Sequence, residues 1–280
     1  MRIGSHVSVA GGVANAPANA ARVGAEVFQI FSRSPHGGPV KPITFEVSAQ
    51  FRSEMKKHKL DTFYIHAPYF INLSSSKNNV YFGSISVLRE ELERGSALDC
   101  KALMTHIGSF GDYTDEEGID RVVKGIVKIL EGYNGPTQFL LEMSAGAGRI
   151  VGDTFEEIAK IIFDKRLENF DIGVCFDTAH AFASGYDISN AEGIKKALEQ
   201  FDKVIGLEKL VVMHANDSKG ELGKHLDRHE HIGQGKIGLD SFKALAADKV
   251  IGGLDWILET PKDSPLDDAT NIEVLMKIRR

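Results

Sequence analysis

The chain has 280 residues, of which 42% are hydrophobic and 26% charged, and its formal net charge is −6. This length allows one large domain, and the composition is ordinary for a globular protein. No apolar run approaches the ~20 residues that a membrane-spanning helix needs, and the acidic balance argues against a protein that coats nucleic acid non-specifically. We therefore expect one domain over residues 1–280 and no membrane association.

The cysteine content indicates a reducing compartment. Cys100 and Cys175 are too few for a disulfide framework, and Cys175 stands inside an apolar run. The first residues read as a strand and lack the apolar core of a signal peptide. We expect a cytoplasmic protein.

Short apolar, β-branched segments alternate with longer segments of helical periodicity along the chain. Eight segments have the composition of buried strands: Arg2–Val9, Val27–Phe31, Phe63–His66, Leu103–His106, Phe139–Glu142, Ile172–Asp177, Leu210–His214 and Trp256–Glu259. Helical segments lie between them: Ser48–Lys59, Val80–Leu98, Asp120–Glu131, Thr154–Phe163, Ala191–Phe201 and Leu239–Ala247. Thr154 with Glu157 has the pattern of a capping box.

This alternation predicts an α/β fold with a parallel sheet, and eight units predict a single (β/α)8 TIM barrel. An open, doubly wound sheet is the alternative. Gly11 and Gly12, after the first strand, lack the spacing of a dinucleotide-binding fingerprint. Long loops follow the strands, at the barrel face where active sites are built: Ser32–Thr44, Ala67–Lys77, Gly108–Gly118, Ser144–Asp153 and Ala215–Lys236.

Side chains that can bind metal stand where the third to eighth predicted strands end. In chain order they are His66, His106, Glu142, Asp177 with His180, His214 and Glu259, and the loop after the seventh strand adds Asp227 and His229. A lone histidine on an apolar face is most often a satisfied core residue, but six consecutive strand ends of this kind are not expected by chance. Since the strand ends meet at one mouth of a barrel, we expect these side chains to converge. Unpaired buried carboxylates cost several kcal/mol each, so the cluster calls for cations.

Imidazole and carboxylate ligands without thiolate suit catalytic zinc, and manganese or iron is also compatible. Nine ligands are too many for one tetrahedral ion and fit two or three. Adjacent divalent cations activate water and clamp both oxygens of an in-line phosphoryl displacement. The residues favour metal-dependent hydrolysis of a phosphate ester. Sugar isomerisation or epimerisation on a two-metal barrel is the alternative.

The chain resembles endonuclease IV, the zinc-dependent apurinic/apyrimidinic endonuclease, over essentially its whole length. The motifs that carry the resemblance are Ile3–Ser8, His66–Leu73, His106–Ser109, Leu141–Glu142, Gly173–Asp187, His214–Lys219, Asp227–Gly235 and Ile257–Thr260. The resemblance implies three zinc ions per chain. Their implied ligands are His66, His106 and Glu142 for the first zinc, Glu142 as a bridge with Asp177, His214 and Glu259 for the second, and His180, Asp227 and His229 for the third.

The resemblance also implies a reaction: hydrolysis of the phosphodiester 5′ to an abasic site in duplex DNA, leaving a 3′-hydroxyl and a 5′-deoxyribose phosphate. Trimming of blocked 3′ ends is the related activity. Glu142, Glu259 and His106 are the expected catalytic residues, with zinc-activated water as the nucleophile. A monomer that binds damaged DNA is expected.

DNA contacts are expected from five further residues. They are Tyr69, Asn72, Arg228, Arg33 and His36. The chain departs from the family pattern in the loop Ser34–Gly38, at Met143, where asparagine is usual, and at Gln234, where an acidic residue is usual. These departures lie outside the implied metal ligands.

Overall fold

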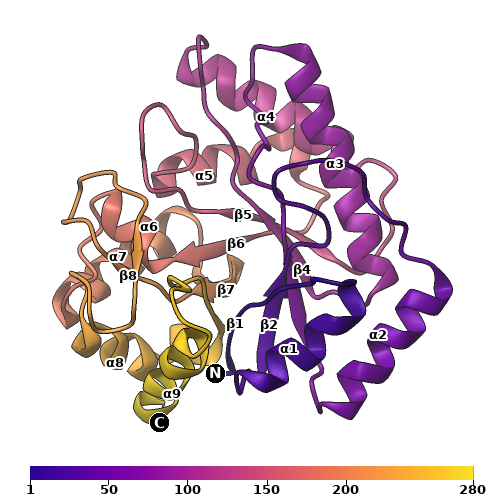
Figure 1. The fold of residues 1–280 in the computed structure, drawn as a ribbon. Helices are drawn as coiled ribbons and strands as arrows, with labels where there is room; N and C mark the ends of the chain where they lie inside the picture. The colour runs from indigo at the N-terminus through magenta and orange to yellow at the C-terminus, as the bar shows by residue number, and fades with distance from the viewer. Residues whose placement is uncertain (280) are drawn as a thin grey trace.

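The computed structural model describes residues 1–279 and contains a closed barrel of parallel strands (Figure 1). The barrel strands are β1 (Ile3–His6), β2 (Val27–Ile30), β3 (Phe63–His66), β4 (Ala102–Thr105), β5 (Gln138–Glu142), β6 (Ile172–Asp177), β7 (Leu210–His214) and β10 (Asp255–Leu258). Each strand pairs with the next in the chain, and β10 closes the barrel by pairing with β1. The predicted TIM barrel is confirmed.

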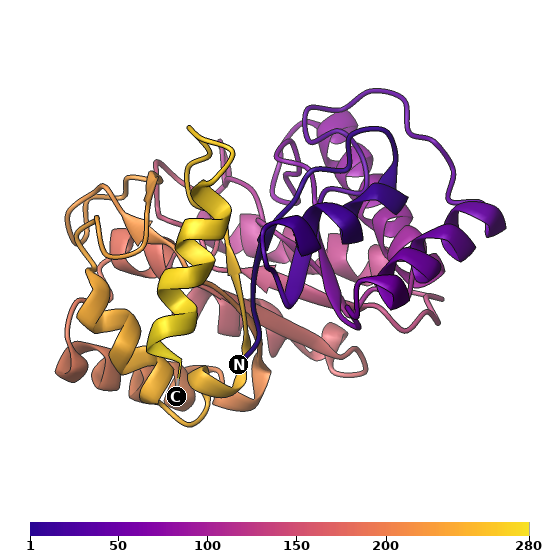
Figure 2. The ribbon, with the colours of Figure 1, turned by 60° about the horizontal axis from the view of Figure 1, so that its bottom comes forward.

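Helices cover the outside of the barrel (Figures 1 and 2). They are α1 (Ala16–Arg22), α2 (Phe45–Lys57), α3 (Asn78–Ala97), α4 (Asp115–Leu130), α5 (Phe155–Ile162), α6 (Thr178–Ala183), α7 (Ala191–Val204), α8 (Leu239–Ala247) and α9 (Asp267–Ile278). In Figure 2, α9 runs alongside the start of the chain, where it packs against β1. Within residues 1–279, no helix has both the length and the apolar character for crossing a membrane.

Short elements complete the loops. Four 3-10 turns are Val13–Asn15, Lys165–Leu167, Leu207–Lys209 and Ile251–Gly253. In the loop after β7, β8 (Asp217–Ser218) pairs with β9 (His229–Glu230) in an antiparallel ladder. The sequence did not predict this ladder or α1, α6 and α9, because each is short or follows a neighbouring element with little periodicity of its own.

The barrel strands are buried on both faces, as expected for parallel strands under helices. Inside the barrel lies a layer made of Val27, Tyr64, Ala102, Met104, Leu140, Cys175, Val212 and Ile257. A larger apolar core fills the space between strands and helices. Four strand predictions run past the observed end: Val27–Phe31, Leu103–His106 and Trp256–Glu259 by one residue, and Arg2–Val9 by three. His106 and Glu259 thus follow β4 and β10 directly instead of ending them. The difference leaves both side chains at the mouth of the barrel.

One predicted helix start is only half right. Thr154 accepts a hydrogen bond from the backbone N–H of Glu157, but the Glu157 carboxylate accepts from the Gly152 N–H and does not close a capping box. The complete capping box lies at the start of α4, between Thr114 and Glu117. The Glu157 carboxylate therefore binds the loop before α5, and not the start of the helix that the capping-box pattern predicted.

An ion pair at the other end of the barrel joins its first and last strands. Arg2, before β1, donates to Asp255 through Nε at 2.8 Å and Nη2 at 2.9 Å, and Tyr64 donates to the same carboxylate at 2.7 Å. Burial alone would raise the pKa of Asp255, but the hydrogen bonds from Arg2 and Tyr64 and the charge of Lys101 outweigh it and hold the pKa below its usual value. The ionised carboxylate is thus the form that the fold stabilises.

Replacing Asp255 with asparagine should lower the free energy of unfolding at pH 7 by about 1–3 kcal/mol, because a nearly buried, bidentate pair is lost. Urea unfolding of the two proteins measures this difference. Asp61→Asn is the matched control, since Asp61 pairs with the same Arg2 but is exposed, and its loss should cost less than about 1 kcal/mol.

The same pair predicts a pH dependence. The pKa of Asp255 is lowered by folding, so its contribution is present above the unfolded-state value, about 4, and is lost as the pH falls through the lower folded-state pKa. The stability gap between the parent and Asp255→Asn should therefore shrink below about pH 4. A gap that stays constant down to pH 2 would contradict this account.

Candidate metal centre

The carboxylate of Glu142, at the end of β5, lies among four histidine rings. Its Oε2 is 2.8 Å from His66 Nε2 and 3.8 Å from His106 Nε2, and its Oε1 is 3.0 Å from His214 Nδ1 and 3.5 Å from His180 Nδ1. These rings come from β3, from the residue after β4, from β7 and from α6. The closed barrel thus brings strand ends that are far apart in the sequence to one carboxylate.

A second set of side chains adjoins Glu142. His214 Nδ1 lies 3.3 Å from Glu259 Oε2 and 3.7 Å from Asp177 Oδ2. Asp177 and His214 are register partners on the neighbouring strands β6 and β7. The four residues each offer one ligand atom within 4.8 Å of the others, the spacing of a shared cation site.

A third set lies beside Asp177. His180 Nε2 is 3.3 Å from Asp227 Oδ1, and His229 Nε2 is 3.7 Å from Asp227 Oδ1 and from Asp177 Oδ2. Asp227 has a side-chain exposure of 53%, whereas His180 and Asp177 are buried. Asp177 therefore faces two of the three sets, a position that the sequence alone did not indicate.

Hydrogen bonds on the far side of the rings orient them toward the carboxylates. Three histidines donate from Nδ1 to backbone carbonyls: His66 to Ala67 at 2.6 Å, His180 to Met143 at 2.9 Å and His229 to Glu259 at 3.0 Å. A proton on Nδ1 leaves the Nε2 lone pair free to face a cation, the arrangement typical of metal-binding histidines. Met143 supplies its bond through the backbone, so its apolar side chain packs in the core without loss to the centre.

Two ring nitrogens at the centre are buried without a hydrogen-bond partner in the described part of the chain: His106 Nδ1 and His229 Nε2. Unpaired buried polar atoms are rare in native proteins and call for an explanation. His229 Nε2 faces Asp177 and Asp227, and this free nitrogen, together with the oxygen and nitrogen donors of three adjacent sets, fits divalent cations. The described residues thus have the chemistry and the spacing of a multinuclear metal centre.

The electrostatics of the cluster point the same way. Burial alone would raise the pKa of Glu142, but the charges of His106, His214 and His66 outweigh it and hold that pKa well below its usual value. Burial alone would lower the pKa of His214, but the negative charges of Glu259 and Glu142 raise it well above its usual value. Positive charge is therefore strongly favoured at this position, whether carried by protons or by a metal.

Cys175 is a neighbour of this centre that the sequence did not single out. Its sulfur lies near Glu142 and His214, its register partner being Glu142. Burial raises the pKa of the Cys175 thiol to about 12, so in the metal-free protein it is a neutral group below the carboxylates. The alternation of strand side chains, which places it inside the barrel, was the available signal.

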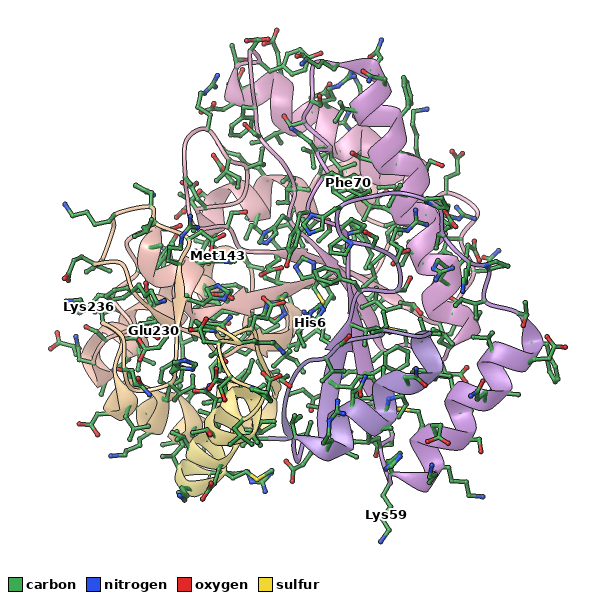
Figure 3. The ribbon with its side chains drawn as sticks, viewed as in Figure 1. His6, Lys59, Phe70, Met143, Glu230 and Lys236 are labelled. Atoms are coloured by element: carbon green, nitrogen blue, oxygen red, sulfur yellow. The ribbon has the colours of Figure 1, made fainter. Side chains whose placement is uncertain are left out.

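A cavity of about 450 Å³ opens above the centre. Its lining includes six of the candidate ligands, His66, His106, His180, Asp227, His229 and Glu259, together with the cationic side chains of Lys219, Arg228 and Lys262. Lys262, which the sequence did not single out, donates to the His6 carbonyl and lies 2.6 Å from Asp268. Figure 3 shows His6 near the middle of the molecule, Met143 and Phe70 above it, and Lys59 at the bottom edge.

Arg33 does not face this cavity. Its side chain is 8% exposed, and its Nε donates to the buried Glu91 at 2.7 Å while Nη2 pairs with Glu90. The contact of Arg33 with DNA stays a prediction. The guanidinium pairs with two carboxylates of α3 and so joins the loop after β2 to that helix.

Aromatic side chains stand beside the cavity. Tyr69 is 62% exposed and packs edge-on against Phe31, with ring centroids 5.1 Å apart, and the exposed His36 lies next to it. Phe70, which the sequence did not single out, is 41% exposed. The available signal for Phe70 was its position directly after Tyr69, in the loop that follows His66.

Asn72 joins two loops beside the cavity, and its predicted contact with DNA stays a prediction. Its Oδ1 accepts hydrogen bonds from the backbone N–H groups of Ser74 and Ser109, so it joins the loops after β3 and β4. Gly108 adopts φ +123°, and a Cβ there would lie 2.3 Å from Asn72 Oδ1. Asn72 thus packs closely against Gly108 and helps to fix the loop that follows His106.

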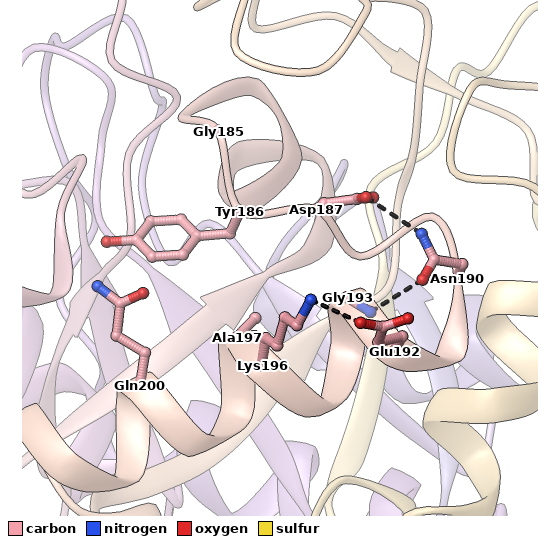
Figure 4. Close-up of a pocket in the computed structure, with 9 residues that line it drawn as sticks. All are labelled: Gly185, Tyr186, Asp187, Asn190, Glu192, Gly193, Lys196, Ala197 and Gln200. Carbon is pink, nitrogen blue, oxygen red and sulfur yellow. Dashed lines mark hydrogen bonds and ion pairs between the residues drawn. The ribbon is translucent and has the colours of Figure 1, made fainter.

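A second hollow, of about 390 Å³, lies at the start of α7 (Figure 4). None of the nine candidate ligands lines it. Its polar groups are paired with one another: Asn190 donates to Asp187 at 3.1 Å, and Lys196 lies 2.6 Å from Glu192. These groups are satisfied within the protein, so the chemistry resides at the strand ends.

Chelation should lower the thermal midpoint of unfolding. Without cations, the buried carboxylates at the strand ends keep only protonated histidines as counter-charges. A ligand at 100 times its Kd stabilises by about 2.7 kcal/mol, and 1 kcal/mol shifts the midpoint of a chain this long by about 2–4 °C. We expect a fall of about 5–10 °C after EDTA treatment, reversed by zinc and measured by scanning calorimetry. Equal midpoints with and without bound metal would contradict the cation account.

The chain matches the family model of xylose isomerase-like TIM barrels over residues 17–278. It is 38% identical to a protein of Methanosphaerula palustris named probable endonuclease 4, over 99% of this chain and 98% of the relative. It is 39% identical to a protein of the same name from Cenarchaeum symbiosum, over 98% of each.

Solved structures agree with this relationship. Endonuclease IV from Thermus thermophilus superposes with a TM-score of 0.87 at 35% identity, over 99% of this chain and 98% of that one. A D-tagatose 3-epimerase-like protein has a TM-score of 0.73 at 20% identity, a likeness that shows the fold alone. By the family model, the full-length relatives and the Thermus structure, the chain belongs to the endonuclease IV family.

Proposed function

We propose that the protein is a DNA-repair hydrolase that cleaves the phosphodiester 5′ to abasic sites in duplex DNA with three zinc ions. Its products would be a 3′-hydroxyl and a 5′-deoxyribose phosphate, and it would also trim blocked 3′ ends. One observation carries the proposal: three adjacent sets of imidazole and carboxylate donors open onto one cavity. The names of the relatives support the same activity.

In this proposal each set holds one zinc. The ligands are His66, His106 and Glu142 for the first, Glu142, Asp177, His214 and Glu259 for the second, and His180, Asp227 and His229 for the third. Zinc, when bound there, activates water near neutral pH and stabilises charge on the phosphoryl and leaving oxygens. Manganese or iron fits the same donors.

The protein's own part in the reaction is placement. Both oxygens of Glu142 face histidines, so this carboxylate fixes the spacing of the first two sets, and Asp177 does the same between the second and third. Glu142, Glu259 and His106 are the proposed catalytic residues because each would hold a cation that carries the reaction. Removing one of them removes charge stabilisation made in the transition state.

DNA binding is assigned to the rim of the cavity. Arg228 and Lys219 line the cavity rim and suit phosphate oxygens, and Lys262 joins them although Asp268 shares its charge. Tyr69 and Phe70 offer exposed rings on which bases can stack. Extruding an abasic nucleotide costs little, since no base has to be unpaired.

The alternative, a two-metal sugar isomerase or epimerase, is less well supported. Epimerases share the barrel at 20% identity or less, which bears on fold and not on activity. The third set, with His180, Asp227 and His229, has no evident use in an enediol reaction. It does fit the handling of a phosphodiester with two oxygens to stabilise.

Glu142→Gln should abolish incision of a duplex that carries one abasic-site analogue. Loss of one charge-stabilising group costs about 100- to 1,000-fold in rate, and a shared ligand should cost at least the upper figure. Single-turnover cleavage on a sequencing gel measures the rate, and elemental analysis counts the metals. Glu208→Gln is the control and should cleave normally, because Glu208 is exposed in the 3-10 turn before β7, at the other end of the barrel from the ligands. Zinc-loaded parent protein that leaves the duplex intact would sink the proposal.

Tyr69→Ala and Phe70→Ala should each weaken binding to the abasic duplex about 10-fold while leaving the zinc content unchanged, because a stacked base contributes about 1–3 kcal/mol. Fluorescence anisotropy with labelled DNA measures the Kd. Phe163→Ala is the matched control, since Phe163 is 57% exposed at the end of α5, where that helix has returned to the other end of the barrel. Unchanged binding in both variants would exclude the two rings as DNA contacts.

A further inference from the structure

Gln29 is a fully buried amide in the otherwise apolar strand β2. A polar side chain in this position is costly unless its hydrogen bonds are satisfied. Three contacts satisfy it: Gln29 Oε1 lies 2.8 Å from His214 Nε2, and Gln29 Nε2 lies 2.6 Å from Glu259 Oε1 and 2.9 Å from His6 Nδ1. The amide therefore connects two candidate ligands of the same set.

The chemistry of these contacts fixes the direction of every hydrogen bond. An ionised Glu259 carboxylate only accepts, so the amide nitrogen of Gln29 must face it, and the amide oxygen must face His214. That oxygen only accepts, so His214 must carry a proton on Nε2. Nδ1, which lies beside Glu142, Asp177 and Glu259, is then the nitrogen that a cation in this set would meet in place of a proton.

The second amide proton fits the same scheme. It is directed at His6 Nδ1, which accepts it when the His6 proton is on Nε2. The bond to Glu259 Oε1 also holds that carboxylate so that Oε2, 3.3 Å from His214 Nδ1, faces the set. The Gln29 amide thus determines which nitrogen of His214 and which oxygen of Glu259 face the proposed cation site.

His214 differs here from the other oriented rings. The far nitrogens of His66, His180 and His229 are held by backbone carbonyls, whereas that of His214 is held by a side chain. A backbone carbonyl persists in any variant, but the support of His214 depends on the residue at position 29. This dependence makes Gln29 a point at which one set can be weakened separately.

We propose that Gln29 is a positioning residue that fixes the metal-binding tautomer of His214 and the orientation of Glu259 in the set they share with Glu142 and Asp177. The inference rests on the proposed metal centre. Residues that orient metal ligands change metal affinity by about 10- to 100-fold when they are removed. Gln29 should therefore control the affinity of one cation of the cluster and leave the others largely unaffected.

The test compares Gln29→Met with Gln138→Met. The first variant keeps the length of the side chain and removes both hydrogen-bonding groups. The second makes the same exchange at the other end of the barrel, where Gln138 donates to Asp171. Zinc is titrated against a chromogenic chelator and counted by elemental analysis. We expect one zinc to bind about 10- to 100-fold more weakly in Gln29→Met and all zinc to bind normally in Gln138→Met.

A second experiment determines the tautomer of the His214 ring. Long-range ¹H–¹⁵N spectra of the zinc-loaded parent should show a His214 ring with its proton on Nε2, and Gln29→Met should lose that signature. Gln29→Glu separates the two tasks and serves if the methionine variant misfolds. Its carboxylate still accepts from His214, so the tautomer should persist, but it repels Glu259, so zinc should still bind more weakly.

The outcomes distinguish this inference from the proposed centre. Parent protein that binds no zinc would overturn the centre itself. Parent protein that binds zinc, with Gln29→Met equally tight and the His214 signature unchanged, would overturn the role of Gln29 alone. A uniform loss of all zinc together with a lower midpoint of the metal-free protein would show that Gln29 acts on folding instead, and would also overturn the inference.

Discussion

The carboxylates gathered at one end of the barrel impose the main constraint on this structure. Glu142 and Asp177 are buried, and Glu259 is only 19% exposed, so their charges must be compensated within a few ångströms. Histidines from several strand ends supply part of the compensation, and the unpaired Nε2 of His229 beside Asp177 and Asp227 is available to a cation. Closure of the barrel makes this possible because it brings all strand ends to one rim.

The candidate ligands are held in place by groups that are not ligands themselves. Backbone carbonyls of barrel strands and adjoining loops hold three rings, and the amide of Gln29 holds a fourth. The segment that follows His229 is held by Asp217, whose buried carboxylate accepts hydrogen bonds from the backbone N–H groups of Gly233, Gly235, Ile237 and Gly238. A long loop can thus position a ligand because a buried carboxylate organises it.

The charged and aromatic residues near the cavity differ in solvent exposure, and only the exposed ones are accessible to a ligand. Arg33 and Arg228 look alike in the sequence, both near candidate ligands, but Arg33 is enclosed by Glu90 and Glu91 while Arg228 is open to the cavity. Tyr69 and Phe70 remain exposed beside the metal sets. The rim therefore has the charge and the rings that a nucleic-acid backbone and its bases would meet.

The sequence by itself determined the barrel, the family and the candidate ligands. The apolar periodicity and the length of a segment indicate whether it is a buried strand. A possible ligand at the end of each buried strand indicates that the ligands meet at one end of the barrel. Both features can be recognised from local sequence patterns. Tertiary structure decided the rest: the burial of Arg33, the use of Glu157 outside a capping box, the thiol of Cys175 below the centre and the contacts of Gln29. Each of these depends on a partner far away in the chain, and a polar side chain finds that partner only when the barrel closes.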